Sequence, residues 1–166
     1  MFLPNALTLL NLALGGGALV CAVEGGFLWA ALLILLAGIS DTLDGRIARR
    51  LAMTSEMGKE LDSLADLVSF GVAPAMLLYL QVLAPAYGSA VAYLVALAFM
   101  LCGAFRLARF NVLNISEYFV GVPITLAGGV LAAVSIAAGH LPASFIAVGM
   151  LVLAGLMIST VRVPKL

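Results

Sequence analysis

Residues 41–66 read DTLDGRIARRLAMTSEMGKELDSLAD and separate two long apolar stretches, FLWAALLILLAGIS at residues 27–40 and LVSFGVAPAMLLYL at residues 67–80. Each apolar stretch runs on into this segment, which predicts helices over residues 27–48 and 58–80. The connection between them is short and polar, and short connections join antiparallel neighbours. The segment therefore predicts a helical hairpin that carries aspartates near the connected ends of both helices.

The four aspartates of this hairpin can converge on one site. Asp41 and Asp44 are spaced i, i+3, and Asp62 and Asp66 are spaced i, i+4, so each pair shares one helix face. At a rise of 1.5 Å per residue, Asp41 and Asp66 each lie roughly 12 Å from the connected end of their helix. A carboxylate at the centre of a bilayer costs about 2.5–3.5 kcal/mol on insertion scales and marks function by default. Because four neighbouring carboxylates repel one another, we expect them to bind hard divalent cations such as Mg²⁺, Mn²⁺ or Ca²⁺.

Composition places the whole chain in a membrane. Of its 166 residues, 64% are hydrophobic and 10% are charged, and the mean hydropathy is +1.22. Apolar runs of about 18 residues or more recur along the chain, which is typical of an integral helical membrane protein. The eight basic and eight acidic residues are too few for a nucleic-acid surface, so no nucleic-acid partner is expected. The first apolar run lacks a basic leader, which favours a retained span over a cleaved signal.

We predict an all-α integral membrane fold, a bundle of six transmembrane helices forming a single domain over residues 1–166. The predicted spans are residues 5–22, 27–48, 58–80, 89–110, 121–139 and 143–161. Glycines lie inside two of them, at residues 15–17 and 128–129, where small residues let membrane helices approach closely.

Basic residues predict the orientation of this bundle. They flank the second and fourth connections and the chain end: Arg46, Arg49, Arg50, Lys59, Arg106, Arg109, Arg162 and Lys165. The first, third and fifth connections have none. Since basic residues gather on the cytoplasmic side, both termini are expected to be cytoplasmic.

Charge balance indicates phosphoryl chemistry at the aspartates. Two divalent cations would offset four carboxylates, and several arginines lie at the same predicted level: Arg49, Arg50, Arg106 and Arg109. The planar guanidinium fork suits phosphate and carboxylate groups. Two metals can polarise a phosphoryl group and neutralise its leaving group, while an aspartate left partly free of metal takes a proton from an attacking hydroxyl.

Two other classes of function use membrane aspartates. They can pair with arginines in a purely structural scaffold, or they can form the ion path of a cation transporter or channel. A transport path favours polar residues through the full depth of the bilayer, whereas these spans are apolar beyond the aspartate level. A scaffold predicts that Asp→Asn changes are tolerated.

The segment from Asp41 to Asp66 resembles the signature of the CDP-alcohol phosphatidyltransferase family, D-x2-D-G-x2-A-R-x8-G-x3-D-x3-D, and every fixed position is met. The likeness extends over six spans and essentially the whole chain. It implies that an acceptor hydroxyl attacks the lipid-bearing phosphate of a CDP-linked lipid and that CMP leaves. It also implies a homodimer.

The resemblance implies roles for individual residues. It makes four residues metal ligands for two divalent ions, Mg²⁺ or Mn²⁺ with Ca²⁺ able to occupy the site: Asp41, Asp44, Asp62 and Asp66. Asp66 is also the expected general base. Three small residues resemble those that line the cytidine nucleotide: Gly45, Ala48 and Gly58. Arg49 resembles an arginine that lies near the phosphates or structures the loop.

Three further segments resemble the members of the family that use serine: PNALTLLN at residues 4–11, FRLARFN at residues 105–111 and FVGVP at residues 119–123. The expected reaction transfers a phosphatidyl group from CDP-diacylglycerol to L-serine. The alternatives are glycerol 3-phosphate or inositol phosphate as the acceptor, or an archaeal CDP-linked ether lipid as the donor.

Arg106, Arg109 and Asn111 are the predicted acceptor-binding residues. Arg106 and Arg109 are spaced i, i+3, so one guanidinium could bind the serine carboxylate while the other faces the diphosphate. Both could instead be positive-inside anchors. Asn5 and Thr8, also spaced i, i+3, could bind the cytosine or ribose, or serve in capping and interhelical bonding.

The substrates also predict where the site opens. CDP and serine are water-soluble, so the active site of this multi-pass cell-membrane protein is expected to face the cytoplasm. The lipid tails stay among membrane lipids, so the site is expected to open laterally as well.

Overall fold

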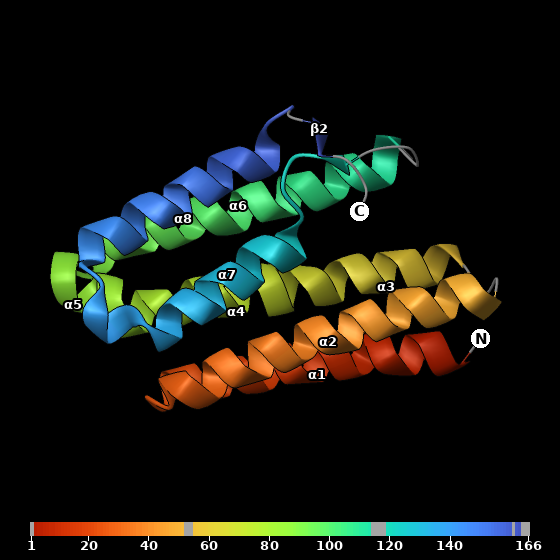
Figure 1. Cartoon of the computed structure of the whole chain (residues 1–166), viewed down its shortest axis with the longest axis horizontal. Helices are drawn as coiled ribbons and strands as arrows, with labels where there is room; N and C mark the ends of the chain where they lie inside the picture. The colour runs from red at the N-terminus through yellow and green to blue at the C-terminus, as the bar shows by residue number, and fades with distance from the viewer. Residues whose placement is uncertain (1, 52–54, 114–118, 161, 164–166) are drawn as a thin grey trace.

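The computed structural model describes residues 2–51, 55–113, 119–160 and 162–163, and these residues form helices with one short strand pair. The long helices lie side by side along the long axis of the molecule (Figure 1). The start of α1, the end of α2, the start of α3 and the end of α6 lie at the same end of the bundle (Figure 1). The described fold is therefore an all-helical bundle, as predicted.

Four continuous helices are long and apolar enough to cross a membrane. The first two are α1 (Phe2–Val23) and α2 (Phe27–Leu51), and the fourth is α6 (Ser89–Leu113). The third runs from Glu56 to Tyr87 through five consecutive elements: α3 (Glu56–Asp66), η1 (Leu67–Val72), α4 (Ala73–Leu78), η2 (Tyr79–Leu83) and α5 (Ala84–Tyr87). The apolar helices are compatible with a multi-pass membrane protein.

The third helix differs from its prediction at both ends. It spans 32 residues, from Glu56 to Tyr87. The residue after it, Gly88, has a φ of +80°, which belongs to the left-handed region that glycine tolerates. The connection expected between the predicted spans 58–80 and 89–110 is therefore reduced to one residue, Gly88. Ser55 caps its start, since the Ser55 hydroxyl accepts a 3.0 Å hydrogen bond from the Gly58 backbone N–H.

Two π-helical turns, η1 and η2, interrupt the third helix, and each precedes a proline. Pro74 and Pro85 have no backbone N–H, so the carbonyls four residues earlier, at Phe70 in η1 and Gln81 in η2, lose their usual helical donors. Single π turns often occur where the regular ladder is disturbed in this way.

The η1 turn is packed between two glycines of neighbouring helices. A Cβ atom added to Gly15 of α1 would lie 2.8 Å from Ser69 Cα, and one added to Gly128 of α7 (Ile124–Ile136) would lie 2.5 Å from the Phe70 carbonyl oxygen. The predicted close approach at the two glycine stretches is confirmed at these positions. At Gly16 and Gly129, by contrast, no described neighbour beyond the adjoining helix backbone lies within 4 Å of an added Cβ.

The last two apolar helices are shorter than the spans predicted for them. The helix α7 has 13 residues and is followed by the 3-10 turn η3 (Ala138–His140), and α8 (Ala143–Ile158) has 16 residues. The chain enters α7 through Gly121, with φ +77°, and Pro123, which is the N-cap. The helix therefore starts at residue 124 instead of the expected 121.

The entrance to α7 is fastened to the end of α8. Strands β1 (Phe119–Val120) and β2 (Arg162–Val163) pair in antiparallel fashion, and the Val122 N–H donates to the Leu156 carbonyl at 3.2 Å. A Cβ at Gly121 would lie 2.5 Å from the Met157 carbonyl oxygen, so this close approach needs glycine.

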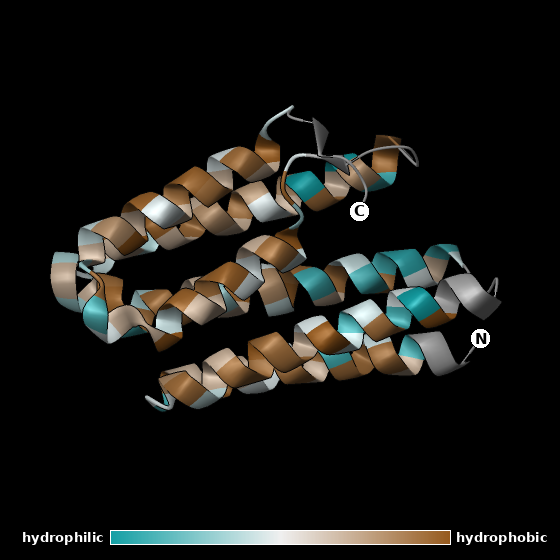
Figure 2. Cartoon of the chain, viewed as in Figure 1, coloured by the Kyte–Doolittle hydropathy of each residue, from teal (hydrophilic) through white to brown (hydrophobic). Residues whose placement is uncertain are grey.

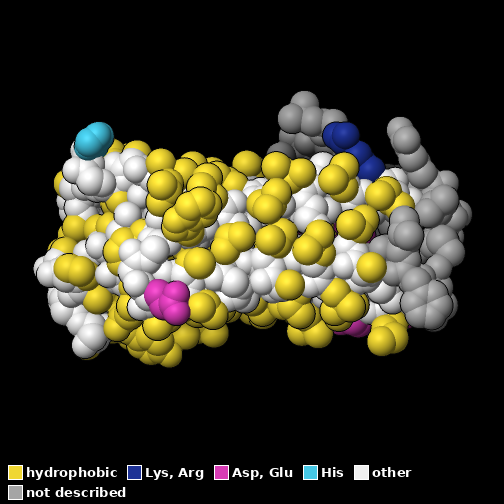
Figure 3. Space-filling view, turned by 90° about the horizontal axis from the view of Figure 1, so that it is seen from below, with side chains coloured by type: hydrophobic (Ala, Val, Ile, Leu, Met, Phe, Trp, Pro, Cys, Tyr) yellow, Lys and Arg dark blue, Asp and Glu magenta, His cyan; other side chains and the backbone are white. Residues whose placement is uncertain are grey.

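Hydrophilic residues concentrate at one end of the bundle. They gather on α2, α3 and α6 towards the connected end of the α2–α3 hairpin, whereas the rest of the bundle is mainly hydrophobic (Figure 2). The face drawn in Figure 3 is covered mostly by hydrophobic side chains, with Lys and Arg side chains only towards that same end. The candidate functional residues are therefore the polar side chains of α2, α3 and α6 at this end of the bundle.

Candidate metal and active site

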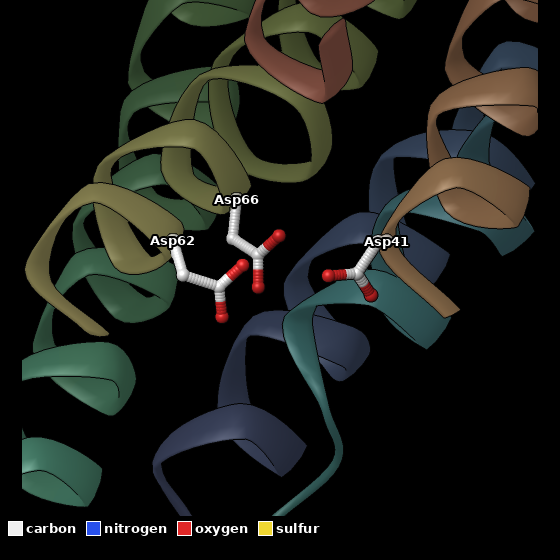
Figure 4. A group of neighbouring side chains, drawn as sticks. All are labelled: Asp41, Asp62 and Asp66. Carbon is white, nitrogen blue, oxygen red and sulfur yellow. The ribbon is translucent and has the colours of Figure 1, made fainter. Parts of the chain in front are cut away.

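Three carboxylates meet between α2 and α3. Asp62 and Asp66 project from successive turns of α3 towards Asp41 of α2 (Figure 4). One oxygen of each carboxylate lies within 4.8 Å of one oxygen of the other two. Asp66 is only 9% exposed, and Asp41 and Asp62 are half-buried. The helical hairpin thus brings together three of the four aspartates predicted as metal ligands.

The chemistry of this group fits a divalent cation. No described Lys or Arg has a side-chain nitrogen within 4.0 Å of an oxygen of the three aspartates. The ion pair that the described residues do form joins Lys59 to Glu56 on the surface of α3. Three converging hard oxygen donors without a close cationic partner are suited to Mg²⁺, Mn²⁺ or Ca²⁺. Their mutual repulsion would be relieved by such an ion.

Asp44 lies one turn beyond Asp41 on α2 and outside the close group of three. It is only 5% exposed. Its Oδ2 accepts a 2.5 Å hydrogen bond from the Thr8 hydroxyl of α1. The structure therefore places Thr8, predicted for the nucleotide, against one of the predicted metal ligands.

A residue that our sequence prediction did not assign to the site, Asn11, lies beside Asp66. Asn11 is fully buried, and its Nδ2 donates to Asp66 Oδ1 at 3.2 Å. Thr8 and Asn11 are spaced i, i+3, so one face of α1 supplies a neutral donor to each pair of aspartates. A polar residue three positions after Thr8 in an apolar span was the available signal.

The other predicted nucleotide-binding residues lie towards the connected end of the hairpin. A Cβ at Gly58 would lie 3.4 Å from Asn5 Oδ1, so the structure brings Asn5 and Gly58 together. Gly45 is exposed on α2. The side chains of Ala48 and Arg49 lie outside the described part of the structure.

The three predicted acceptor-binding residues of α6 have different surroundings. Arg106 is only 6% exposed, and its guanidinium carbon lies 6.0 Å from the centre of the Phe110 ring. Among the described residues, its Nε has no hydrogen-bond partner. Asn111 Nδ2 donates to the Ser63 hydroxyl of α3 at 2.9 Å.

Arg109 instead binds the end of α8. Its guanidinium donates to the carbonyls of three consecutive residues, at 3.4, 3.0 and 3.2 Å: Met157, Ile158 and Ser159. A cation at the last carbonyls of a helix satisfies their unpaired acceptors and interacts favourably with the helix dipole. Arg109 therefore holds α6 and α8 together.

Comparison with known proteins agrees with this arrangement. The family model for CDP-alcohol phosphatidyltransferase matches residues 1–161. A Mycobacterium tuberculosis (strain H37Rv) protein named CDP-diacylglycerol–serine O-phosphatidyltransferase is 43% identical over 129 residues, which are 73% of this chain and 44% of the relative. The chain thus spans less than half the length of the mycobacterial relative.

Two further relatives match almost the whole chain. The Bacillus subtilis (strain 168) CDP-diacylglycerol–serine O-phosphatidyltransferase is 36% identical over 98% of this chain and 90% of its own length. The archaetidylserine synthase of Methanothermobacter thermautotrophicus is 36% identical over 98% of this chain and 70% of its own length. The predicted resemblance is confirmed: the chain belongs to the CDP-alcohol phosphatidyltransferase family.

Proposed function

We propose that this protein transfers the phosphatidyl group of CDP-diacylglycerol to the hydroxyl of L-serine, giving phosphatidylserine and CMP. The observation that carries the proposal is the convergence of three carboxylates within 4.8 Å between α2 and α3. The names of the relatives support serine as the acceptor. The proposed catalytic unit is one domain over residues 1–166.

Members of this family depend on divalent metal, and the aspartate group suits such ions. We assign four residues to two ions, Mg²⁺ or Mn²⁺ with Ca²⁺ as a substitute: Asp41, Asp44, Asp62 and Asp66. Bound there, the ions would polarise the phosphoryl group and neutralise the departing CMP. Thr8 would orient the Asp44 carboxylate through its hydrogen bond.

Asp66 is the proposed general base. Its buried carboxylate takes the proton of the serine hydroxyl as the serine oxygen bonds to the lipid-bearing phosphorus. The bond between that phosphorus and the bridging oxygen of the diphosphate breaks, and its electron pair leaves with CMP. We favour direct displacement, in which the aspartates serve as metal ligands and base and none of them bonds to phosphorus.

The substrates would occupy the two sides of the aspartates. We assign the cytidine nucleotide to the residues near the connected end of the hairpin: Asn5, Gly45, Ala48, Arg49 and Gly58. Arg106 is buried and its Nε has no hydrogen-bond partner in the described part of the chain, and it is the proposed partner of the serine carboxylate. Arg109 and Asn111 would position this pocket by tying α6 to α8 and to Ser63, next to Asp62.

We further propose six membrane spans with both termini in the cytoplasm, an active site that faces the cytoplasm, and a homodimer. The clustering of hydrophilic residues at one end of the bundle supports this orientation (Figure 2). The helices α7 and α8 would complete the six as short spans.

An acceptor panel tests the proposal directly. The purified protein is incubated with CDP-diacylglycerol, Mn²⁺ or Mg²⁺, and L-serine, glycerol 3-phosphate or inositol phosphate, and CMP release is followed. Of the three acceptors, we expect only L-serine to give CMP release. Release with either phosphate compound but not with serine would overturn the acceptor assignment.

A parallel assay tests the donor. The archaeal relative favours a CDP-linked ether lipid as a second candidate donor, because its name is archaetidylserine synthase and it matches 98% of the chain. Comparing the two CDP-lipids at equal concentration with serine decides between the donors.

A further inference from the structure

Two buried polar atoms remain without a hydrogen-bond partner among the described side chains, Asn11 Oδ1 and Arg106 Nε. Asn11 is 0% exposed and Arg106 is 6% exposed, so neither atom can be satisfied by bulk solvent. Buried polar atoms are normally paired, and an unpaired one in a native site calls for an explanation such as a ligand. One atom is an acceptor and the other is a donor.

Both atoms belong to helices that pack on the turn following Asp66. Asn11 donates from Nδ2 to Asp66 Oδ1, and Arg106 is a buried residue of α6. The helices that carry them, α1 and α6, both pack on η1, which begins directly after Asp66. Figure 1 shows α1 and α6 on opposite sides of this helix. The helices that carry the unpaired acceptor and the unpaired donor therefore flank the segment that begins directly after the proposed base.

The orientation of the Asn11 amide follows from its partner. An ionised carboxylate can only accept hydrogen bonds, so the amide must present its NH₂ group to Asp66 and leave Oδ1 for another donor. The position of Asn11 is fixed by its backbone, because the Ser69 hydroxyl donates to the Asn11 carbonyl at 2.9 Å. The close packing of Gly15 on Ser69 holds α1 at this level.

We infer that Asn11 is an acceptor-binding residue whose Oδ1 accepts a hydrogen bond from the ammonium group of an α-amino acid. The carboxylate of the same amino acid is bound by Arg106, and its side-chain hydroxyl lies at Asp66. The inference rests on the proposed function and adds the part of the pocket that distinguishes an amino acid from other hydroxyl compounds. A small zwitterion supplies one donor and one anion, which the two unpaired atoms require.

The test is the preference of the enzyme for L-serine over 3-hydroxypropionate, which is serine without its ammonium group. The ratio of the two kcat/KM values is measured by CMP release from CDP-diacylglycerol. A hydrogen bond to a charged group corresponds to a preference of about tenfold or more. Asn11→Leu should reduce the ratio by about that factor, whereas Asn11→Asp keeps an acceptor oxygen at this position and should retain the preference for serine.

Two control variants separate the ammonium contact from general damage. Arg106→Lys should lower the preference for L-serine over ethanolamine, which lacks the carboxylate, and leave the ratio of serine to 3-hydroxypropionate unchanged. Ser135→Ala removes a buried hydrogen bond in α7, outside the acceptor pocket, and should leave both ratios unchanged. If Asn11→Leu does not fold, Asn11→Ala takes its place. If a variant turns over too slowly for kcat/KM to be measured, the ratio of the dissociation constants of L-serine and 3-hydroxypropionate is compared instead.

The outcomes distinguish the inference from the function on which it rests. An unchanged ratio in Asn11→Leu or Asn11→Ala, with wild-type CMP release from serine intact, overturns the inference alone. A higher Mn²⁺ requirement with an unchanged ratio would make Asn11 a metal ligand and overturn the inference too. If the wild-type protein does not use serine at all, the inference and the proposed function fall together.

Discussion

Two polar regions inside the bundle differ in whether their hydrogen bonds are complete. At one, Gln81 of η2 and Ser135 of α7 form a closed pair: the Ser135 hydroxyl donates to Gln81 Oε1 at 2.5 Å, and Gln81 Nε2 donates to the Ser135 carbonyl at 3.1 Å. At the other, three carboxylates converge, and Asn11 Oδ1 and Arg106 Nε stay unpaired. A closed pair stabilises packing, whereas the open groups at the second region require ligands.

The regions share the same helix, so the difference lies in the residues around each π turn. The η1 turn follows Asp66 and is packed between glycines of α1 and α7. The η2 turn contains Gln81, whose long side chain reaches α7, where both its amide oxygen and its amide nitrogen form hydrogen bonds with Ser135. We therefore expect substitutions in the first region to change catalysis and substitutions in the second to change stability.

The largest effect is expected from Asp66→Asn. An amide cannot take the proton of the attacking hydroxyl, so CMP release should fall by about 10²–10⁴-fold. The variant keeps a side chain of the same shape beside Asn11, and its thermal unfolding should remain cooperative. Near wild-type turnover would contradict the base assignment and favour a structural role for the aspartates.

Asp62→Asn should act mainly through the metal. Removing one of three converging carboxylates weakens a cation site, so the Mn²⁺ concentration for half-maximal CMP release should rise by about 10–100-fold. Glu60→Gln, an acidic residue of α3 outside the close group, is the matched control and should leave the Mn²⁺ requirement unchanged. An equal rise in both variants would indicate a general charge effect.

Thr8→Val tests whether the α1 face orients the aspartates. The variant keeps the shape of Thr8 and removes its hydrogen bond to Asp44, so kcat should fall by about 10-fold. Thr42→Val removes a hydroxyl that donates to the Gly38 carbonyl of its own helix at 2.8 Å, and it should have no such effect. Equal kcat values for both variants would show that the Thr8 hydroxyl does not orient Asp44.

The smallest catalytic effect is expected at the closed pair. Ser135→Ala leaves the Gln81 amide short of a partner and should lower the free energy of unfolding by about 1–3 kcal/mol with kcat unchanged. Because the two side chains satisfy each other, Ser135→Ala combined with Gln81→Leu should cost less than the sum of the single changes. Additive losses would show that the pair is not closed.

The hairpin and its aspartates could be predicted because they depend on local spacing. The i, i+3 and i, i+4 intervals of the aspartates and a short connection place Asp41, Asp62 and Asp66 at one level, whatever surrounds them. The position of Asp44, turned towards Thr8, depends on where α1 packs. No spacing within the hairpin contains that information.

The remaining features arise from contacts distant in sequence. Helix continuity through Pro85 depends on the π turn before it, and the late start of α7 depends on Gly121 packing against α8. Arg109 is predicted to bind the acceptor from its spacing with Arg106, and its carbonyl partners, about 50 residues along the chain, could not be read from that spacing. Asn11 reads as one polar position in an apolar helix until α1 is placed against Asp66.

Removing the metal and then returning it is the sharpest test of the proposed divalent-cation site. The purified protein is treated exhaustively with a chelator, and CMP release from CDP-diacylglycerol and L-serine is measured before and after Mn²⁺ or Mg²⁺ is added. We expect release to stop on chelation and to return with the metal in the wild-type protein, with a higher Mn²⁺ requirement in Asp62→Asn. Full CMP release after complete chelation would show that the reaction does not depend on a divalent cation at the aspartates.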